Sequence, residues 1–180
     1  MKQKKYFKLT NNIYLKLITL KDARLIYNLR TNKKLSKYLN PTSHKLSDQI
    51  LWMKEYFTRN NKELEYYFKF QLKKKNKFND IGVARVIKLS KNNFSFGSWI
   101  MKPNLPSWIA LECALSIYEF AFIIKKFKKN LMWMDLNNKK VIIFHKLMGA
   151  VETNRDKTQL YAFLTKSSYK KLKKKFIFFY

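Results

Sequence analysis

The longest apolar segment of this chain runs from Trp108 to Ile124, and everything else in the fold must accommodate it. It contains two carboxylates, Glu112 and Glu119. A membrane span of this length rarely carries two acidic residues, because a charge inside lipid is costly. The segment therefore predicts a buried amphipathic helix, and we expect no transmembrane segment.

Periodicity places the other elements around this helix. Alternation of apolar and polar residues marks strands, and apolar residues three or four apart mark helices. The central strands follow one another through short turns, which predicts a three-stranded meander before the long helix. The expected order is a hairpin or broken strand within 6–20, a helix near 22–27, a helical turn at 35–39, a helix at 50–57, a strand at 66–72, a polar loop at 73–80, strands at 81–89 and 94–101, the long helix at 107–127, a strand at 131–136, a helix at 139–148 capped by Gly149, and a last β region at 150–164.

Composition describes a folded, very basic protein. The chain has 180 residues, 47% of them hydrophobic and 17% aromatic, which excludes a disordered basic tail. This length fits one domain. We expect a single domain over residues 1–166, followed by a basic and aromatic C-terminal tail over residues 167–180.

The charge has two readings that the sequence leaves open. Lys and Arg number 39 against 11 Asp and Glu, for a formal net charge of +28, and only five of the basic residues are arginine. One explanation is a compositional bias toward Lys at tolerant surface positions. The other is a functional positive field that attracts polyanions. The preference for Lys argues against sequence-specific reading of nucleic acid, because guanidinium groups are the better readers of base edges.

Cys113 is the single cysteine, so the chain forms no internal disulfide. Reducing compartments favour such a composition, and we expect a cytoplasmic protein. No set of metal ligands is expected either.

Four local patterns, in order along the chain, carry a resemblance to a known family. A strand leads into a helix that ends on Arg-x-Asn within 18–32, and Asp80–Val83 contains an Ile-Gly pair. Phe96–Ile100 and the segment Asn138–Ala150 follow, the latter with Ala150 where an aromatic is usual. In this order they resemble the GNAT superfamily of acyl-CoA-dependent N-acyltransferases. The resemblance implies an α/β (α+β) fold with a central mixed, mostly antiparallel sheet flanked by helices.

A finer resemblance concerns the acceptor. Asn138–Val141, His145–Lys146 and Met148–Gly149, together with Ser43–Ser47 before the second helix, are similar to acetyltransferases that modify nucleotide-linked amino-dideoxy sugars. Such enzymes serve surface-glycan pathways, including those of pseudaminic acid and O-antigen sugars. The resemblance implies transfer of an acetyl group from acetyl-CoA to a primary amine.

The chemistry requires a neutral amine, stabilisation of negative charge on the thioester carbonyl, and a proton for the leaving thiolate. In the family a tyrosine four residues before the capping glycine often supplies this proton, and here that position is His145. An imidazole of ordinary pKa, about 6.5, could do so, although a packed or surface role is the alternative. Asn138 is expected either to contact the pantetheine arm or to cap the helix that follows it.

The phosphate-binding loop departs from the family pattern. Aligned here, the signature falls on 105–110 and keeps only Ala110, while Trp108 replaces a glycine and Pro106 removes an N–H donor. Backbone amides at the start of the long helix could still hold phosphates, or the loop has decayed and the donor differs. With the end of the fourth strand and Asn138, the expected acetyl-CoA contacts are Ile100, Met101, Ser107, Trp108, Ile109, Ala110 and Asn138.

The substrate side is expected to use Arg30, Asn32, His44 and Tyr67, with Tyr67 or Phe68 as an aromatic platform for a base. A charge of +28 repels cationic acceptors, so we expect a small anionic molecule that carries an amine, and no specific nucleic acid. A homodimer is left open.

Two other classes of function remain as alternatives to the acetyltransferase. Aromatic residues interleaved with lysines, as in Tyr66–Lys69, and the basic run Lys170–Lys175 would suit a nucleic-acid-binding protein, and a catalytically degenerate relative would keep the fold alone. The segment Lys170–Tyr180 also pairs basic with aromatic residues, as surface-bound membrane helices do.

Overall fold

The computed structural model describes residues 6–75 and 77–180, so the first five residues of the expected domain lie outside it. Eight strands form one sheet in the order β1-β2-β3-β4-β5-β6-β8-β7. They are β1 (Tyr6–Lys8), β2 (Ile13–Leu17), β3 (Glu65–Lys74), β4 (Lys77–Lys88), β5 (Asn93–Met101), β6 (Lys129–Asp135), β7 (Val151–Arg155) and β8 (Gln159–Thr165). The helices are α1 (Ala23–Thr31), α2 (Leu46–Asn61), α3 (Ser107–Tyr118), α4 (Lys139–Leu147) and α5 (Lys166–Lys175).

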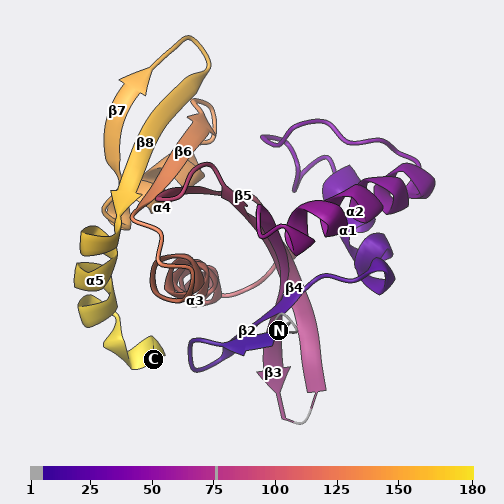
Figure 1. Ribbon diagram of the computed structural model, residues 1–180, viewed down its shortest axis with the longest axis horizontal. Helices are drawn as coiled ribbons and strands as arrows, with labels where there is room; N and C mark the ends of the chain where they lie inside the picture. Colours follow the sequence, from indigo (N-terminus) through magenta and orange to yellow (C-terminus); the bar gives the residue numbers. More distant parts are fainter. Residues whose placement is uncertain (1–5, 76) are drawn as a thin grey trace.

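The sheet is mixed and mostly antiparallel, as expected, because every neighbouring pair of strands runs antiparallel except β5 and β6. Helix α3 lies within the curve of the sheet, and α1 and α2 cover the opposite face (Figure 1). Each face has its own apolar cluster. The larger one joins α3 to β2–β6 and β8, and the smaller one joins α1 and α2 to the other side of β3, β4 and β5.

Helix α3 is buried on all sides over Glu112–Phe122, where the sequence had suggested an amphipathic helix. It continues beyond Tyr118 as a π-helical turn, Glu119–Ile124. By length and composition 107–124 could cross a membrane, but 61% of that window is buried within the fold. Its two carboxylates have protein partners. Glu112 accepts hydrogen bonds from the backbone N–H groups of Asn12 (2.6 Å) and Ile13 (3.2 Å), and Glu119 pairs with Lys173 at 2.9 Å.

Three local expectations differ from the structure. The polar loop expected at 73–80 is a hairpin, because β3 and β4 extend through it as far as the pair Lys74 and Lys77. No helix forms at 35–39, but single hydrogen-bonded turns do, since the Ser36 N–H donates to the Asn32 carbonyl and the Leu39 N–H to the Ser36 carbonyl, both at 2.9 Å. Leu35 and Leu39 pack against the smaller apolar cluster. The last β region is two strands, and β8 lies between β6 and β7.

The basic C-terminal segment is a structured part of the fold. Helix α5 and the 3₁₀ turn Ile177–Phe179 follow β8, and Tyr169, Leu172 and Phe179 are buried in the larger cluster. The chain ends beside the β1–β2 turn, because the backbone N–H of Asn11 donates to the Phe179 carbonyl at 2.7 Å. Lysines thus occupy the outer face of this helix, and its aromatic residues close the core.

Candidate active site

A wedge opens where the two parallel strands separate. Strands β5 and β6 pair only at Asn93 with Lys129 and at Phe94 with Asn130. Beyond that point the Asn130 side chain replaces the sheet ladder by accepting a hydrogen bond from the Phe96 N–H at 3.0 Å. A cavity of about 290 Å³, which we name the wedge cavity, lies between the strands. Its walls are β5, β6 and the face of α4 that bears Val141 and His145.

A β-bulge in β5 shapes one wall of the wedge cavity. Opposite β4, Val83 pairs with Ile100 and Arg85 with Gly97, so that Ser98 and Trp99 together face Ala84. Ser98 has a φ of 47°, a backbone conformation that residues other than glycine rarely adopt. Bulges of this kind change the direction in which nearby side chains point and are common beside active sites. The buried Trp99 Nε1 has no hydrogen-bond partner among residues 6–75 and 77–180. The wall therefore offers irregular backbone and an unused donor to whatever fills the wedge.

Gly82 allows the strands next to this bulge to approach closely. A Cβ at this position would lie 2.5 Å from the Ile100 carbonyl oxygen and 3.0 Å from the Met101 Cα. Because both are backbone atoms, a side chain would force β4 and β5 apart. This explains the glycine of the Ile-Gly pair.

A second cavity of about 380 Å³, which we name the α-side cavity, lies between α1, α2, their connection, and strands β3 and β4. Arg30, Asn40 and Arg85 line both cavities. The two spaces therefore meet at a junction with two guanidinium groups.

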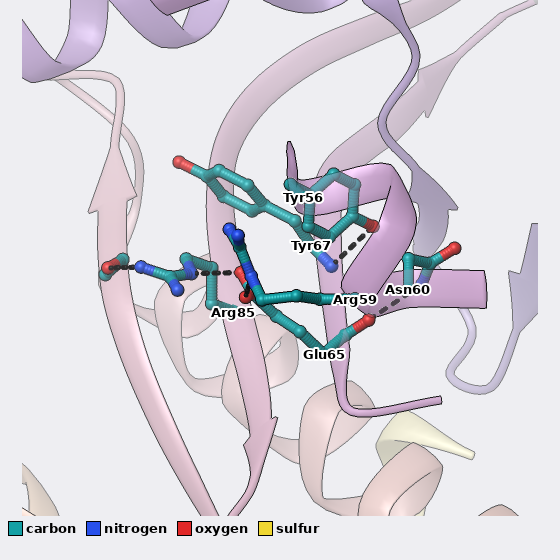
Figure 2. Close-up of polar contacts among 7 residues, drawn as sticks. Tyr56, Arg59, Asn60, Glu65, Tyr67 and Arg85 are labelled. Carbon is teal, nitrogen blue, oxygen red and sulfur yellow. Dashed lines mark hydrogen bonds and ion pairs between the residues drawn. The ribbon is translucent and has the colours of Figure 1, made fainter. Parts of the chain in front are cut away.

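Arg85 is held at this junction by a buried carboxylate. Glu65 is 2% exposed and receives the Nε–H of Arg85 at 2.7 Å and the Nε–H of Arg59 at 2.8 Å. Figure 2 shows both guanidinium groups at the Glu65 carboxylate. Both also lie over the ring of Trp52, at 5.3 Å for Arg59 and 5.0 Å for Arg85. Of the two arginines, only Arg85 lines the cavities, and it extends to the Ser98 hydroxyl of the bulge at 3.4 Å.

The remaining walls of the α-side cavity add hydrogen-bond donors. Burial raises the pKa of Tyr67 to about 12, while Arg30 and Arg85 act in the opposite direction, so the hydroxyl keeps its proton. In Figure 2 this hydroxyl points away from α2. Gln49 is 9% exposed, and its Nε2 has no partner within the described part of the chain. Arg30 is itself tied by a 2.8 Å hydrogen bond to the Asn40 carbonyl, and burial lowers its pKa from the usual value.

His145 faces the wedge cavity from α4, but in a different state from the one expected. It is 5% exposed, its Nδ1 lies 3.3 Å from the Tyr118 hydroxyl, and its ring packs edge-on against Phe96. Burial lowers its pKa to about 4. The sequence argument used an unperturbed pKa near 6.5; the buried imidazole is instead neutral at pH 7 and holds a hydrogen for donation rather than a positive charge.

The turn after α4 fixes the position of His145. The Gly149 N–H donates to the Lys146 carbonyl and the Ala150 N–H donates to the His145 carbonyl, both at 2.9 Å. Gly149 has a φ of 83°. These two bonds form a Schellman motif, so the glycine cap expected from the sequence is confirmed.

The residues expected to contact acetyl-CoA divide into two groups. Asn138 lies at the wedge cavity and precedes α4, where its carbonyl accepts the Val141 N–H at 3.1 Å. The other six line neither cavity. Ile100 and Met101 end β5, and Ser107, Trp108, Ile109 and Ala110 form the first turn of α3, where no side chain caps the backbone N–H groups. Trp108 is 42% exposed, with its ring stacked on Phe179.

Of the residues expected on the substrate side, the structure brings Arg30 and Tyr67 together in the α-side cavity. The sequence had suggested the ring of Tyr67 as a stacking platform for a base. The residue is only 2% exposed, so its ring is not available for stacking, and it presents its hydroxyl instead. Asn32 lies outside both cavities at the end of α1, and its side-chain oxygen accepts the N–H groups of Lys34 and Leu35 in the turn that follows the helix. His44 is exposed and outside both cavities as well; its carbonyl accepts the Tyr27 hydroxyl at 2.9 Å.

Sequence reasoning missed Arg85, Glu65 and Gln49. One signal could have found the arginine. Only five arginines occur beside 34 lysines, and three of the five, Arg30, Arg59 and Arg85, belong to this junction or its support. In a chain whose basic residues are nearly all lysines, an arginine marks a position that needs a planar guanidinium group. No comparable signal marks Glu65 or Gln49.

Comparisons with known proteins agree with this geometry. The family model described as an acetyltransferase (GNAT) domain matches residues 12–151. The solved structure of apo FdhC, a nucleotide-linked sugar GNAT, is 32% identical, covers 94% of this chain and 96% of its own, and has a TM-score of 0.84. Spermidine N-acetyltransferase from Vibrio cholerae, solved with CoA and spermine, is similar in fold at 18% identity, 88% and 98% coverage and a TM-score of 0.75. Among curated protein sequences, none matches the chain.

Proposed function

The chain belongs to the GNAT acetyltransferase family, whose members are N-acetyltransferases that use acetyl-CoA, and we propose that its acceptor is the amine of a nucleotide-linked amino sugar. The observation that carries this proposal is the charge of the α-side cavity. Arg30 and Arg85 face it, and its one acidic residue, Asp48, is already bonded to the Ser43 hydroxyl at 2.6 Å.

A cationic acceptor fits this cavity poorly. Polyamines need carboxylates or aromatic faces that neutralise their ammonium groups, and two guanidiniums would repel them. An acceptor that carries a diphosphate would be attracted, both locally and by the net charge of +28. The likeness of apo FdhC, described as a nucleotide-linked sugar GNAT, supports the same class of acceptor.

The wedge cavity suits acetyl-CoA as the donor. Bound acetyl-CoA supplies the acetyl group as a thioester. We assign the bulge of β5 at Ser98 and the unpartnered Trp99 Nε1 to its acyl end, and Asn138 to the pantetheine arm. The uncapped N–H groups at Ser107 and Trp108 are assigned to the phosphates, since the start of a helix favours anions.

His145 has a revised role in this proposal. With a pKa of about 4, its imidazole is not a reservoir of protons at neutral pH. If the Tyr118 hydroxyl donates to Nδ1, the Nε2 atom carries the hydrogen and can donate a hydrogen bond to the leaving sulfur, while the proton that the thiolate finally takes is the one that the amine loses on acetylation. We therefore expect His145→Phe to lower kcat, with little effect on the affinity for acetyl-CoA. An unchanged kcat would remove His145 from the reaction.

Two measurements test the proposal. Isothermal titration with acetyl-CoA should give saturable binding. A lack of binding would show that the loop at 105–110, which differs from the family pattern, no longer binds the phosphates of the cofactor. Release of CoA should then be followed with UDP- and dTDP-linked amino sugars, with UDP-glucosamine among them, and with spermidine as the cationic comparison. Transfer to a nucleotide-linked amine but not to spermidine is expected. Transfer to spermidine alone would refute the assignment of the acceptor.

A further inference from the structure

We propose that the α-side cavity is an anion subsite in which Arg30, Arg85 and Gln49 hold a phosphate group of the acceptor, with Glu65 positioning Arg85. This inference rests on the proposed function and deepens it, because it names the part of the acceptor that the cavity recognises. Unused hydrogen-bond donors, the charge of the cavity and the unequal placement of two similar arginines support this subsite.

The cavity contains more donors than the protein uses. An arginine side chain has five N–H groups. In Arg85 one is bonded to Glu65 and a second makes a long 3.4 Å contact with Ser98, and no other hydrogen-bond partner is present in the described ranges. Gln49 Nε2 is buried without a partner. A buried donor without a partner destabilises the fold, because it loses its hydrogen bonds to water and gains none. A bound ligand that accepts a hydrogen bond from this amide would account for its position.

Charge favours an anion over a neutral acceptor group. Arg30 and Arg85 are close enough that the charge of Arg85 contributes to lowering the pKa of Arg30. The nearby carboxylates cancel this positive charge only in part. Glu65 is shared between Arg59 and Arg85, and Asp48, which also accepts from the hydroxyls of Ser43 and Ser47, still leaves one guanidinium charge unmatched. An oxyanion between the two guanidiniums would relieve the repulsion and receive charge-assisted hydrogen bonds.

Arg59 and Arg85 form a natural matched pair. Each donates its Nε–H to Glu65 (Figure 2). Each also lies over the ring of Trp52. Arg85 lines both cavities and Arg59 lines neither. Replacing either arginine removes the bond to Glu65 and the contact with Trp52; Arg85 also loses the 3.4 Å contact with Ser98 and its place over the ring of Tyr67, and only its replacement changes the cavity. Any difference between the two variants in ligand affinity therefore reports the subsite itself.

The position of the subsite suits a sugar phosphate. The two arginines stand at the junction with the wedge cavity, where transfer to an amine would take place. In a nucleotide-linked amino sugar the distal phosphate and the ring amine are joined through one pyranose ring, so a phosphate held here leaves the amine near the β5 bulge. A sugar acid presents the same oxyanion chemistry through a carboxylate, and the test separates the two sources.

The test is isothermal titration of the full chain with UDP, in the presence of saturating CoA to occupy the donor's own phosphate site. UDP, UMP, uridine and glucuronate are compared on the wild type and on Arg85→Gln, Arg59→Gln and Gln49→Leu. We expect UDP to bind, uridine not to bind, and Arg85→Gln to weaken UDP about tenfold or more, the size of one to two charge-assisted hydrogen bonds. Gln49→Leu should weaken UDP several-fold, and Arg59→Gln less than threefold.

The other outcomes separate the subsite from the proposed function. An equal loss of UDP affinity in Arg59→Gln and Arg85→Gln would mean that both substitutions act by disturbing the fold around Glu65. Displacement of UDP by CoA would mean that UDP binds at the donor site. Glucuronate binding more tightly than UMP would replace phosphate by carboxylate. UDP binding that depends on Arg85, without acetyl transfer to any nucleotide-linked amine, would keep the subsite and refute the proposed function. Transfer with an acceptor KM unchanged in Arg85→Gln would refute the subsite alone.

Discussion

The buried imidazole of His145 should make the stability of this protein depend on pH in a way that one substitution removes. In the unfolded chain the pKa of a histidine is about 6.5. In the folded chain burial lowers it to about 4. Between these values the unfolded state binds more protons than the folded state, so the free energy of unfolding falls as the pH falls. The stabilisation is fully present above about pH 6.5 and is lost as the pH approaches 4.

The size of the effect follows from the two pKa values. One pKa unit corresponds to 1.36 kcal/mol, so a difference of roughly 2.5 units is worth about 3 kcal/mol. The matched variant is His145→Gln, which does not titrate and can still accept a hydrogen bond from Tyr118. Urea unfolding of both proteins at pH 4, 5, 6 and 7 gives the difference at each pH. Carboxylates elsewhere titrate equally in both proteins and cancel.

We expect the wild type to lose about 3 kcal/mol relative to His145→Gln between pH 7 and pH 4. Parallel curves for the two proteins would refute the reasoning, because they would mean that the imidazole is hydrated or paired with an acid in the folded state. The same result would restore His145 as a candidate proton donor of ordinary pKa. The experiment therefore decides between the two roles of this residue without any substrate.

Three other substitutions test the supports of the site by urea unfolding. Gly149→Ala should cost about 1 kcal/mol, because the φ of 83° suits glycine, and no loss would contradict the Schellman cap. Asn130→Ala should cost about 1–3 kcal/mol by leaving the Phe96 N–H unpaired at the apex of the wedge, with wild-type stability as the contrary result. Glu112→Gln should also cost at least about 1–3 kcal/mol, since its new NH₂ group would face the N–H donors of Asn12. Asn137→Asp, on the exposed surface, serves as a control that should leave stability unchanged.

The sheet and its helices could be predicted largely from periodicity, because alternation and helical spacing report which faces are buried. The family patterns then placed Asn138 and His145, and both lie at the wedge cavity. Three things could not be predicted. Burial of His145 depends on Phe96, 49 positions earlier, and on Tyr118, so its pKa cannot be read locally. The carboxylate of Glu65 selects Arg85 by proximity across two strands. Asn32 matches the family pattern, and yet its side chain holds the turn that follows α1.

The junction of Glu119 with the end of the chain has a consequence for synthesis on the ribosome. This carboxylate lies at the end of α3, and its partners Tyr169 and Lys173 come from α5, the last helix. Strand β8, which enters the sheet between β6 and β7, is also made late. While residues 166–180 are still inside the exit tunnel, the most apolar helix of the chain has no cover on that side. This side of the helix should therefore become covered only after residues 166–180 have left the tunnel, and until then it exposes apolar surface.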